Sequence, residues 1–336
     1  MSSQDPHSGP LRILVLAGGP SAEREISLRS GLAVCDALAG LGHHVTAFDP
    51  QHEQLAGIDA TQFDVAFIAL HGRYGEDGGV QTQLAALGLP YTGSDARSSA
   101  LAFSKTSAKA KFNEHDVPTP AAVYFQSGES LAECVARAAP LGFPVVVKPD
   151  RQGSSLGISF ASNPAELEKS IEAALVFDSQ GLIEVVIAGE EWTVPLLGEE
   201  VLPPIRIGTP HAFFDYEAKY LREDTAYEFP VDVSPELLTR IQSTAQQAVR
   251  SLGVTSLSRV DLRIDSDGQP WVLEVNTIPG LTDHSLAPKS AAHSGLTFAQ
   301  LCLTVCQRAI ADCRRDPLSL QTRQEPRVKT EIRRAS

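Results

Sequence analysis

Short runs of hydrophobic residues alternate with amphipathic segments along the first third of the chain. The runs at 11–19, 44–50 and 64–72 have the length and apolar content of buried strands, and the segment at about 21–41 has the pattern of a helix. Strands that alternate with helices predict a parallel sheet with helices packed on its faces. The chain is therefore expected to begin with an α/β domain.

The middle and the end of the chain carry a less regular mixture of strands and helices. One long helix is expected after the turn at 90–95, and it stops before Pro118 and Pro120. The segment 200–232 is rich in charged and aromatic residues and is expected to be irregular. The remaining predictions are strands at 121–125, 143–149, 158–161 and 182–187 and helices near 128–140, 164–176, 234–253 and 297–313.

One hairpin near the end of the chain, "RVDLRIDSDGQPWVLEVNTIPG", carries an unusual set of polar residues. An Asp-Gly pair between two alternating runs favours a two-residue turn, here at Asp267–Gly268. That turn places Asp261 opposite Glu274. It also places Arg259 opposite Asn276, and the period of two puts all four side chains on one face. The opposite, core-facing side collects the apolar residues Val260, Leu262, Ile264, Trp271, Leu273 and Val275.

The facing carboxylates of this hairpin predict a bound cation. Two opposed carboxylates about 5 Å apart repel each other unless a cation or a proton lies between them. Oxygen ligands from Asp, Glu and Asn suit Mg²⁺, which completes its coordination with water and phosphate oxygens. A wet sheet face with its charges in solvent is the alternative that the hairpin leaves open.

Four further segments place polar residues next to predicted strands or in loops. "VKPDRQGSSLGIS" is rich in glycine, so its N–H groups and Lys148 can approach a phosphate, although a simple tight turn is an equal alternative. In "LAGGPSAERE", Ser21 fits an N-cap with Glu23 in the first helical turn, and the glycine spacing of dinucleotide folds is absent. His71 lies just past a strand, where a lone histidine is more often a hydrogen-bonding partner than a catalyst. Lys219 lies in "DYEAKYLRED", either a solvated loop or a lid over a substrate.

Composition narrows the class of protein. The chain has 336 residues, 43% hydrophobic and 21% charged, which is ordinary for a globular protein of two or three domains. A net charge of −13 argues against nucleic acid as a partner. The sequence has no apolar run of about 18 residues and no signal-peptide pattern, and its five cysteines are scattered, so we expect no membrane span and a reducing, cytoplasmic location. Cys302 and Cys306 share a predicted helix face and are expected to be buried thiols.

Seven segments, in this order, resemble the D-alanine–D-alanine ligase family of the ATP-grasp superfamily. They are "GGPSAEREISLRSG", "LHGRYGEDG", "PYTGS", "KPDRQGSSLG", "DYEAKY", "RVD" and "LEVNTIPGLTDHSL". The resemblance runs from Leu11 to about Cys313 and implies an α/β fold in which a parallel-sheet N-terminal domain precedes two α+β domains that grip ATP. The implied parts are an N-terminal domain at 11–95, a central domain at 96–187 and a C-terminal domain at 188–313. Composition adds two expectations outside this span, a flexible leader at 1–10 and a basic, disordered tail at 314–336.

The resemblance also implies a two-step reaction. The carboxylate of one D-alanine takes the γ-phosphoryl group of ATP, which gives an acyl phosphate and ADP. The amine of a second D-alanine then attacks the carbonyl carbon and expels phosphate, and the product D-alanyl-D-alanine serves peptidoglycan synthesis. Two Mg²⁺ or Mn²⁺ ions and a homodimer are implied as well.

Each implied role falls on residues of this sequence. The implied metal ligands are Asp261, Glu274 and Asn276. The groups implied to stabilise the tetrahedral intermediate are Arg259 and the N–H of Gly280. Those implied to bind the phosphates, the adenine and the ribose of ATP are Lys105, Lys148, Lys219, Glu184, Ile187 and Glu191. Those implied to bind the two amino acids are Glu23, supported by His71, Ser154 and Tyr220, for the first, and Ser285 and Leu286 for the second.

Five positions depart from the family pattern. Ser104 stands where Asp usually precedes the first phosphate lysine, Asp150 where Ser is frequent, and Gln152 where Glu is frequent. Val186 lies where an aromatic residue often packs near adenine, and Asp283 adds a carboxylate near the second amino-acid subsite. Negative charge at Asp150 and Asp283 is expected to weaken anion binding or to change the pairing of the loop.

Two alternatives remain open at this stage. The same chemistry with D-lactate or D-serine as the second substrate depends on the loop around that subsite, and Tyr220 in "YEAKY" favours D-alanine. A non-catalytic nucleotide-binding homologue would have lost metal ligands or phosphate lysines, and this chain keeps both.

Overall fold

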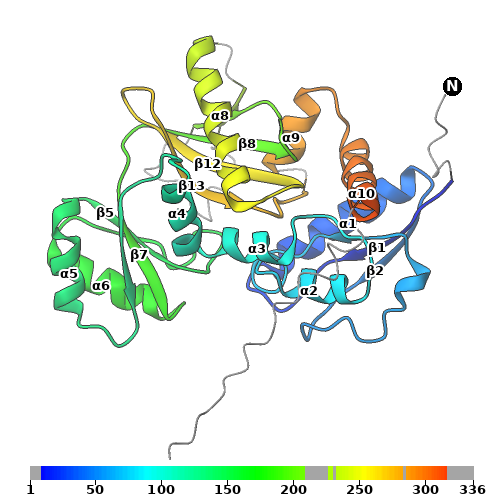
Figure 1. Cartoon of the computed structure of the whole chain (residues 1–336), viewed down its shortest axis with the longest axis horizontal. Helices are drawn as coiled ribbons and strands as arrows, with labels where there is room; N and C mark the ends of the chain where they lie inside the picture. Colours follow the sequence, from blue (N-terminus) through cyan, green and yellow to red (C-terminus); the bar gives the residue numbers. More distant parts are fainter. Residues whose placement is uncertain (1–8, 209–225, 230–231, 283–284, 316–336) are drawn as a thin grey trace, which may run out of the picture.

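The computed structural model forms three lobes in a row along the long axis of the molecule (Figure 1). We call them the N-terminal lobe (sheet β1 to β3), the central lobe (sheet β4 to β7) and the C-terminal lobe (sheet β8 to β13). The predicted α/β class, with one parallel sheet followed by antiparallel ones, is confirmed, while the exact domain boundaries stay predictions. The residues that the structure describes are 9–208, 226–229, 232–282 and 285–315.

The N-terminal lobe contains the parallel sheet that the alternating pattern predicts. Its strands, in the order β2-β1-β3, are β1 (Arg12–Leu16), β2 (His44–Phe48) and β3 (Val65–Ile68). Helix α1 (Arg24–Gly40) and the C-terminal helix α10 (Phe298–Arg315) share one apolar core with this sheet. Helix α2 (Gly79–Ala86) belongs to a second core built from the alternate residues of β1 and β3. A short 3-10 helix, Ala60–Gln62, precedes β3.

Helix α10 returns the end of the described chain to the first sheet. Cys302 and Cys306 are buried in the core shared with α1, as predicted. Burial raises the pKa of the Cys302 thiol to about 12. A buried, neutral thiol is an inert packing group rather than a nucleophile or a metal ligand. Within the ranges that the structure describes, no helix has the length and hydrophobicity needed to cross a bilayer.

Helix α1 begins three residues later than predicted, and Ser21 is not its N-cap. Residues Ser21 to Glu23 form a turn in which the N–H of Arg24 donates to the carbonyl oxygen of Ser21 (3.1 Å). The Oγ of Ser21 donates instead to the carbonyl oxygen of His71 (2.6 Å). This turn leaves the Glu23 side chain without a capping hydrogen bond to α1 and directs it toward the cavity described below.

The single long helix predicted after residue 95 is two helices. Helix α3 (Ala96–Phe103) ends and α4 (Lys105–Glu114) begins at Ser104, whose backbone is extended with φ −84° and ψ 110°. The Oγ of Ser104 accepts a hydrogen bond from the N–H of Ser107 (3.2 Å), the arrangement that makes serine a common N-cap. The break places Lys105 at the first position of α4.

The central lobe is an antiparallel sheet with two helices on one face. Its strands, in the order β4-β7-β5-β6, are β4 (Ala122–Gln126), β5 (Val145–Pro149), β6 (Ser159–Ala161) and β7 (Gln180–Val185). The helices are α5 (Leu131–Ala138), followed by a short 3-10 turn at Ala139–Leu141, and α6 (Pro164–Leu175). All six main elements lie within a few residues of their predicted positions. The face away from these helices, with Val146, Lys148 and Glu184, lines a cavity.

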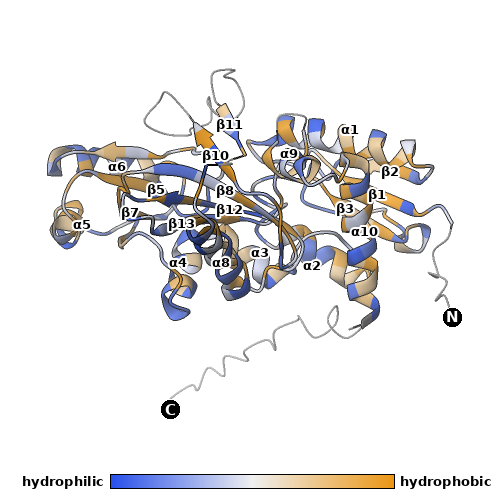
Figure 2. Cartoon of the chain, turned by 90° about the horizontal axis from the view of Figure 1, so that it is seen from above, coloured by the Kyte–Doolittle hydropathy of each residue, from blue (hydrophilic) through white to orange (hydrophobic). Residues whose placement is uncertain are grey.

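The C-terminal lobe contains the largest sheet, with strand order β11-β10-β8-β12-β13 and β9 beside β8. Its strands are β8 (Glu190–Leu197), β9 (Glu200–Val201), β10 (Ile205–Gly208), β11 (Ala226–Glu228), β12 (Leu257–Ile264) and β13 (Pro270–Asn276). Helices α3, α4 and α8 (Pro235–Leu252) pack on one face of this sheet (Figure 2). Trp192 and Leu262 are fully buried on that face.

The sequence analysis missed several elements of this lobe. Strand β8 contains Pro195 and begins with two glutamates, so its pattern does not resemble a central strand. The segment 200–232 was expected to be irregular, which is wrong in its described part because β10 and β11 pair there. Helix α9 (Leu286–His293) follows the hairpin and is not among the predicted helices.

The polar hairpin of β12 and β13 has a different turn from the predicted one. Asp265 pairs with Gln269 around three residues, and Gly268 has φ +73°. A β-bulge after Asp261 then shifts the register back by one residue. Asp261 therefore does lie opposite Glu274, and the pairing of Arg259 with Asn276 is confirmed as well.

The bulge changes which residues of β13 face the core. Val272 is fully buried, whereas Leu273 turns to the polar side and lines a cavity. Trp271 is half-buried, and its Nε1 donates to Asp265 (2.8 Å). The predicted core face was therefore wrong for Leu273 and Trp271, because the bulge reverses the alternation between Asp261 and the turn.

Candidate active site

A cavity of about 360 Å³ opens between the sheets of the central and C-terminal lobes, a volume typical of small-molecule sites. Its apolar walls come from both sides, with Val146 and Phe160 on the central lobe and Leu273 at the bulge of β13. Ile187 and Glu191, two of the residues implied to bind ATP, line the same cavity. Apolar walls with a few charged groups suit a flat aromatic base carried on a polar chain.

Charged side chains form a buried triad at one side of this cavity. Glu184 on β7 is fully buried and forms ion pairs with Lys148 on β5 and with Lys109 on α4, the latter at 2.6 Å. Burial by itself would raise the pKa of Glu184, but the charges of Lys148 and Lys109 outweigh it and hold that pKa below its ordinary value. The sequence analysis did not single out Lys109, since a lysine in a helix is usually exposed.

The polar face of the hairpin closes the cavity on the C-terminal lobe. Asp261 and Glu274 both line it. The carboxylate of Asp261 accepts hydrogen bonds from the Nε and Nη2 of Arg259 (2.8 and 2.7 Å) and from the Oγ1 of Thr193 (2.6 Å). Asn276 lies two residues beyond Glu274 on the same face of β13.

These oxygen donors fit a hard divalent cation. In the part of the chain that the structure describes, no three His, Cys, Asp or Glu side chains gather into a metal-binding cluster. An ion at this face would therefore have the carboxylates of Asp261 and Glu274, the amide oxygen of Asn276, and oxygens from water and phosphate. Mg²⁺ binds in this way, with few protein ligands. The three predicted metal ligands agree with this chemistry and lie on one face.

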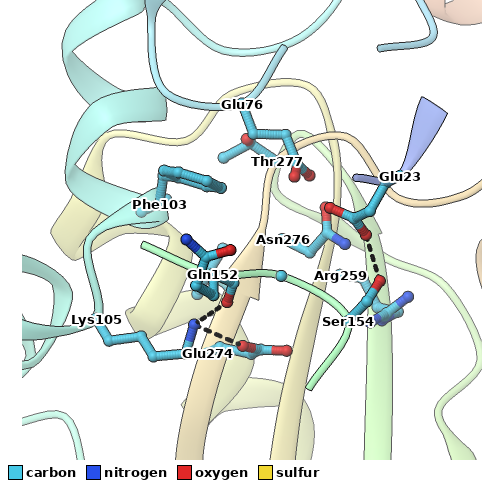
Figure 3. Close-up of a pocket in the computed structure, with 13 residues that line it drawn as sticks. Glu23, Glu76, Phe103, Lys105, Gln152, Ser154, Arg259, Glu274, Asn276 and Thr277 are labelled. Atoms are coloured by element: carbon cyan, nitrogen blue, oxygen red, sulfur yellow. Dashed lines mark hydrogen bonds and ion pairs between the residues drawn. The ribbon is translucent and has the colours of Figure 1, made fainter. Parts of the chain in front are cut away.

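A smaller cavity of about 60 Å³ receives residues from all three lobes (Figure 3). Its charged and polar lining comprises Glu23, Glu76, Lys105, Gln152, Ser154, Arg259, Glu274, Asn276 and Thr277. Lys105 and Glu274 line both this cavity and the larger one. The Nζ of Lys105 lies 3.7 Å from Glu274 and donates to the carbonyl oxygen of Gln152 (2.7 Å). The two cavities thus meet at a lysine and a carboxylate.

Glu23 connects the N-terminal lobe to the loop that follows β5. Its carboxylate accepts a hydrogen bond from the Oγ of Ser154, as Figure 3 shows. Two glycines leave room for it, because a Cβ at either Gly72 or Gly153 would lie 2.7 Å from the Oε2 of Glu23. A carboxylate held in place at the wall of a small cavity is suited to bind an ammonium group.

Glu76 lines the same cavity, although the sequence analysis did not assign it a role. Its Oε2 accepts a hydrogen bond from the N–H of Gly72 (2.7 Å). Burial, and then the charge of Glu23, raise the pKa of Glu76 well above its ordinary value. Burial and the neighbouring carboxylate thus disfavour the charged form of Glu76, and a cation in the cavity would favour it. Its position inside "LHGRYGEDG", one of the seven family segments, is the signal that could have found it.

His71 lies behind the cavity rather than among the residues that line it. Its Nε2 is 3.1 Å from the Oγ of Ser30, and its Nδ1 is 3.1 Å from the carbonyl oxygen of Ile278. Burial lowers the pKa of His71, which keeps the imidazole neutral. This geometry agrees with the structural alternative for a lone histidine, in which the ring joins two segments of the chain.

The predicted second amino-acid subsite lies at the start of α9. The Oγ of Ser285 accepts a hydrogen bond from the N–H of Thr282 (2.9 Å), and a Cβ on Gly280 would lie 2.7 Å from that Oγ. The side chain of Leu286 packs with Ile205 and Ile207. Three predicted positions, Lys219, Tyr220 and Asp283, lie outside the described residues.

Comparisons with known proteins agree on one family. The models described as "D-ala D-ala ligase N-terminus" and "D-ala D-ala ligase C-terminus" match residues 46–94 and 112–307. The D-alanine–D-alanine ligase of Ectopseudomonas mendocina (strain ymp) is 45% identical over 304 residues, which cover 90% of this chain and 96% of that protein.

Solved structures extend the comparison to the whole fold. The D-alanine–D-alanine ligase of Bacillus anthracis complexed with ATP superposes with a TM-score of 0.81 at 31% identity, and the match covers 91% of this chain and 99% of that one. The D-Ala:D-Ser ligase VanG of Enterococcus faecalis superposes with a TM-score of 0.79 at 28% identity, covering 90% of this chain and all of that one.

Proposed function

Because this chain belongs to the D-alanine–D-alanine ligase family, we propose that it joins two D-alanine molecules into D-alanyl-D-alanine with the conversion of ATP to ADP and phosphate. The product serves peptidoglycan synthesis. The single observation that carries the proposal is the junction of the two cavities at Lys105 and Glu274. A nucleotide in the larger cavity and an amino acid in the smaller one would bring phosphate and carboxylate together at that junction.

The larger cavity is assigned to ATP. Its apolar walls hold the adenine, with Glu184 and Ile187 beside the base, and Glu191 is suited to bind the ribose. Lys105 and Lys148 are assigned to the phosphates, because both residues line the cavity. Lys219 is assigned to the γ-phosphate through the family resemblance alone.

The hairpin face is assigned to the metal. Asp261, Glu274 and Asn276 would hold Mg²⁺ or Mn²⁺, two ions in the complete complex, which neutralise charge on the transferring phosphoryl group. Arg259, beside these residues, has a separate role. Arg259, oriented by Asp261, points its guanidinium at the smaller cavity, where with the N–H of Gly280 it stabilises the oxyanion of the tetrahedral intermediate.

The smaller cavity is assigned to D-alanine. Glu23 binds the ammonium of the first D-alanine, and Ser154 holds the Glu23 carboxylate in place. Tyr220 is assigned to the same substrate through the family resemblance alone. His71 supports this wall from behind. Ser285 and Leu286, at the start of α9, are assigned to the carboxylate of the second D-alanine. The chemistry then follows in two steps, in which the carboxylate attacks the γ-phosphorus with loss of ADP, and the second amine displaces phosphate and loses a proton.

Product analysis tests the reaction and the choice of second substrate. The protein is incubated with ATP, Mg²⁺ and either D-alanine alone or D-alanine with D-lactate or D-serine, and the products are identified by mass spectrometry. We expect D-alanyl-D-alanine together with D-alanine-dependent release of ADP. A preference for D-lactate or D-serine at neutral pH would assign the same fold to the alternative ligases. Release of ADP without any ligated product would overturn the proposal.

A pair of lysine variants on one helix assigns the activity to the site. Lys105→Met removes the ammonium at the junction and should reduce ligation by about 100-fold or more. Lys111→Met is the matched control, because Lys111 lies on the same helix and its side chain pairs with Glu114 outside both cavities. Equal activity of the two variants would remove Lys105 from the mechanism.

The proposal also covers the cellular location, the oligomeric state and the partners of the enzyme. We assign it to the cytoplasm as a homodimer with small-molecule partners only. All five cysteines are free, which agrees with a reducing compartment. The net charge of −13 disfavours nucleic acid as a partner. Sedimentation at several concentrations measures the oligomer, and a monomer throughout would contradict the dimer.

A further inference from the structure

Asp150 is a fully buried carboxylate in the loop that follows β5, at a position where the family pattern has serine. Its Oδ1 accepts a hydrogen bond from the N–H of Thr106 (2.8 Å). Its Oδ2 accepts from the Oγ of Ser104 and from the Nε2 of Gln180, both at 2.9 Å, and lies 3.4 Å from the Nε of Arg151. Every one of these contacts donates to the carboxylate, so the charge is stabilised inside the protein rather than directed at a ligand.

The first turn of α4 depends on this loop. The first N–H groups of a helix have no partner within the helix and must be satisfied from outside. The N–H of Lys105 donates to the carbonyl oxygen of Asp150 (3.2 Å), the N–H of Thr106 to its carboxylate (2.8 Å), and the N–H of Ser107 to Ser104 (3.2 Å). Asp150 and Ser104 therefore satisfy all three groups.

The same loop also holds the side chain of the helix's first residue. The Nζ of Lys105 donates to the carbonyl oxygen of Gln152, two residues beyond Asp150 (2.7 Å). The backbone of Lys105 and its ammonium are thus both bound to the stretch 150–152. Asp150 itself lines neither of the two cavities. The negative charge of Asp150 therefore faces α4 rather than the cavities. Of the two expected consequences of this residue, the structure agrees with changed pairing of the loop.

We propose that Asp150 is a positioning residue, which locks the loop after β5 to the first turn of α4 and so fixes Lys105 Nζ where the two cavities meet. Its partner is Ser104, at a contact of 2.9 Å. By the resemblance described above, aspartate is usual at 104 and serine is frequent at 150, so we infer that the two residues form an exchanged pair. Whichever of the two positions holds the aspartate, one carboxylate and one hydroxyl accept hydrogen bonds at the N-terminus of α4. A helix N-terminus is stabilised by one negative charge. The inference rests on the proposed ATP site, and it adds a residue that the nucleotide does not touch.

Exchanging the two residues tests this pairing. Asp150→Ser leaves the helix N-terminus without a carboxylate, whereas Ser104→Asp brings two carboxylates into contact. The double variant Ser104→Asp/Asp150→Ser restores one of each. Because the residues touch, their effects should be strongly non-additive. We expect each single change to weaken binding of Mg²⁺-ATP, titrated without D-alanine, by about tenfold or more, and the double variant to return to within about threefold of the original protein.

Two controls separate positioning from simple stability. Asp95 caps α3 in a similar way, with its Oδ1 accepting from the N–H of Ser98 (2.7 Å), yet it lines neither cavity. Asp95→Ser should lower the urea midpoint without changing the affinity for Mg²⁺-ATP. Asp150→Asn keeps the size of the side chain and one oxygen for Thr106. Asp150→Asn should fold and should bind Mg²⁺-ATP with an affinity between those of the original protein and Asp150→Ser. It replaces Asp150→Ser in the test if that variant does not fold.

The outcomes are distinct from those that test the reaction. A nucleotide affinity that is unchanged in Asp150→Ser and Asp150→Asn, with only the urea midpoint lowered, would overturn the positioning role. A double variant no better than its worse single parent would overturn the exchange. Failure of the original protein to make D-alanyl-D-alanine would refute the proposed reaction but leave these nucleotide affinities, and the inference drawn from them, measurable.

Discussion

Replacing Lys109 by methionine tests whether the buried charges beside the nucleotide cavity are a cooperative unit. The ammonium of Lys109 is 2% exposed, lies 2.6 Å from Glu184 and donates to the Oγ1 of Thr119 and the carbonyl oxygen of Pro120, both at 2.7 Å. Methionine has a similar length and keeps the apolar contacts. The substitution therefore removes the charge and three polar contacts and leaves the packing nearly intact.

The structure sets the size of the effect. Removing one partner of a buried ion pair costs about 3–5 kcal/mol, because the other charge is left without compensation. Glu184 keeps Lys148 as a second counter-ion, which places the expected loss at the lower end, about 3 kcal/mol. With an m-value of about 3 kcal/mol/M in urea, the midpoint should fall by about 1 M. Lys148 would then face Glu184 alone, so the affinity for Mg²⁺-ATP should fall as well.

Urea unfolding followed by circular dichroism, together with titration of Mg²⁺-ATP, measures both effects. Lys111→Met is the matched control, since Lys111 lies two residues further along α4 and its partner Glu114 is 59% exposed at the side chain. Such an exposed pair contributes about 0.5 kcal/mol or less. If Lys109→Met moved the midpoint no further than Lys111→Met, removing one counter-ion of Glu184 would cost no stability and the reasoning from burial would be refuted.

Three further substitutions test separate parts of the molecule. Gly153→Ala places a Cβ 2.7 Å from the Oε2 of Glu23, so KM for D-alanine should rise about tenfold with KM for ATP nearly constant, and equal changes in both would contradict the assignment. Arg259→Lys loses the planar pair with the neighbouring aspartate, and kcat should fall by about 100-fold, whereas a kcat close to the original would exclude an oxyanion role. Asp49→Asn tests a pH-dependent contribution, because the hydrogen bonds of Arg24 lower the pKa of Asp49 from 3.8 to about 2. That shift corresponds to about 2.4 kcal/mol of stability, which partial exposure reduces to about 1 kcal/mol. Asp49→Asn should lose this full stability at pH 7, and the loss should shrink as the pH falls below 3.8 toward 2. Urea midpoints at several pH values measure it, and a loss independent of pH would contradict the ion pair.

The hairpin illustrates how much of the site could be predicted from local pattern. The opposition of Asp261 and Glu274 was predicted from alternation and an Asp-Gly pair, and it is confirmed. The turn was predicted one residue too short, and the bulge at Leu273 compensates for that shift. No local signal marks a bulge at a leucine between a valine and a glutamate in an alternating strand. The bulge matters for the site, since it places Leu273 in the wall of the cavity that we assign to ATP.

The break between α3 and α4 shows why another part could not be predicted. The stretch from Ala96 to Glu114 contains no proline or glycine, so its sequence favours one continuous helix. The helix is interrupted at Ser104 because Asp150, 46 residues away, supplies acceptors for a new helix N-terminus. Lys109 and Glu76 were missed for a related reason, because their burial depends on segments that are distant in the sequence.

Lys105 shows why so many charges are buried where the lobes meet. Helix α4 is anchored in the core of the C-terminal lobe through Ala108 and the fully buried Phe112, whereas the ammonium of Lys105 is bound to Gln152 in the central lobe. The lysine therefore spans the cavity and would lose its partner if the lobes rotated apart. A cation fixed before the substrate arrives needs no reorganisation as charge develops on the phosphoryl group, which makes it more effective in catalysis. The desolvation of these charges lowers stability, and the separate apolar core of each lobe offsets it, so the site can be rigid without being the part that holds the fold together.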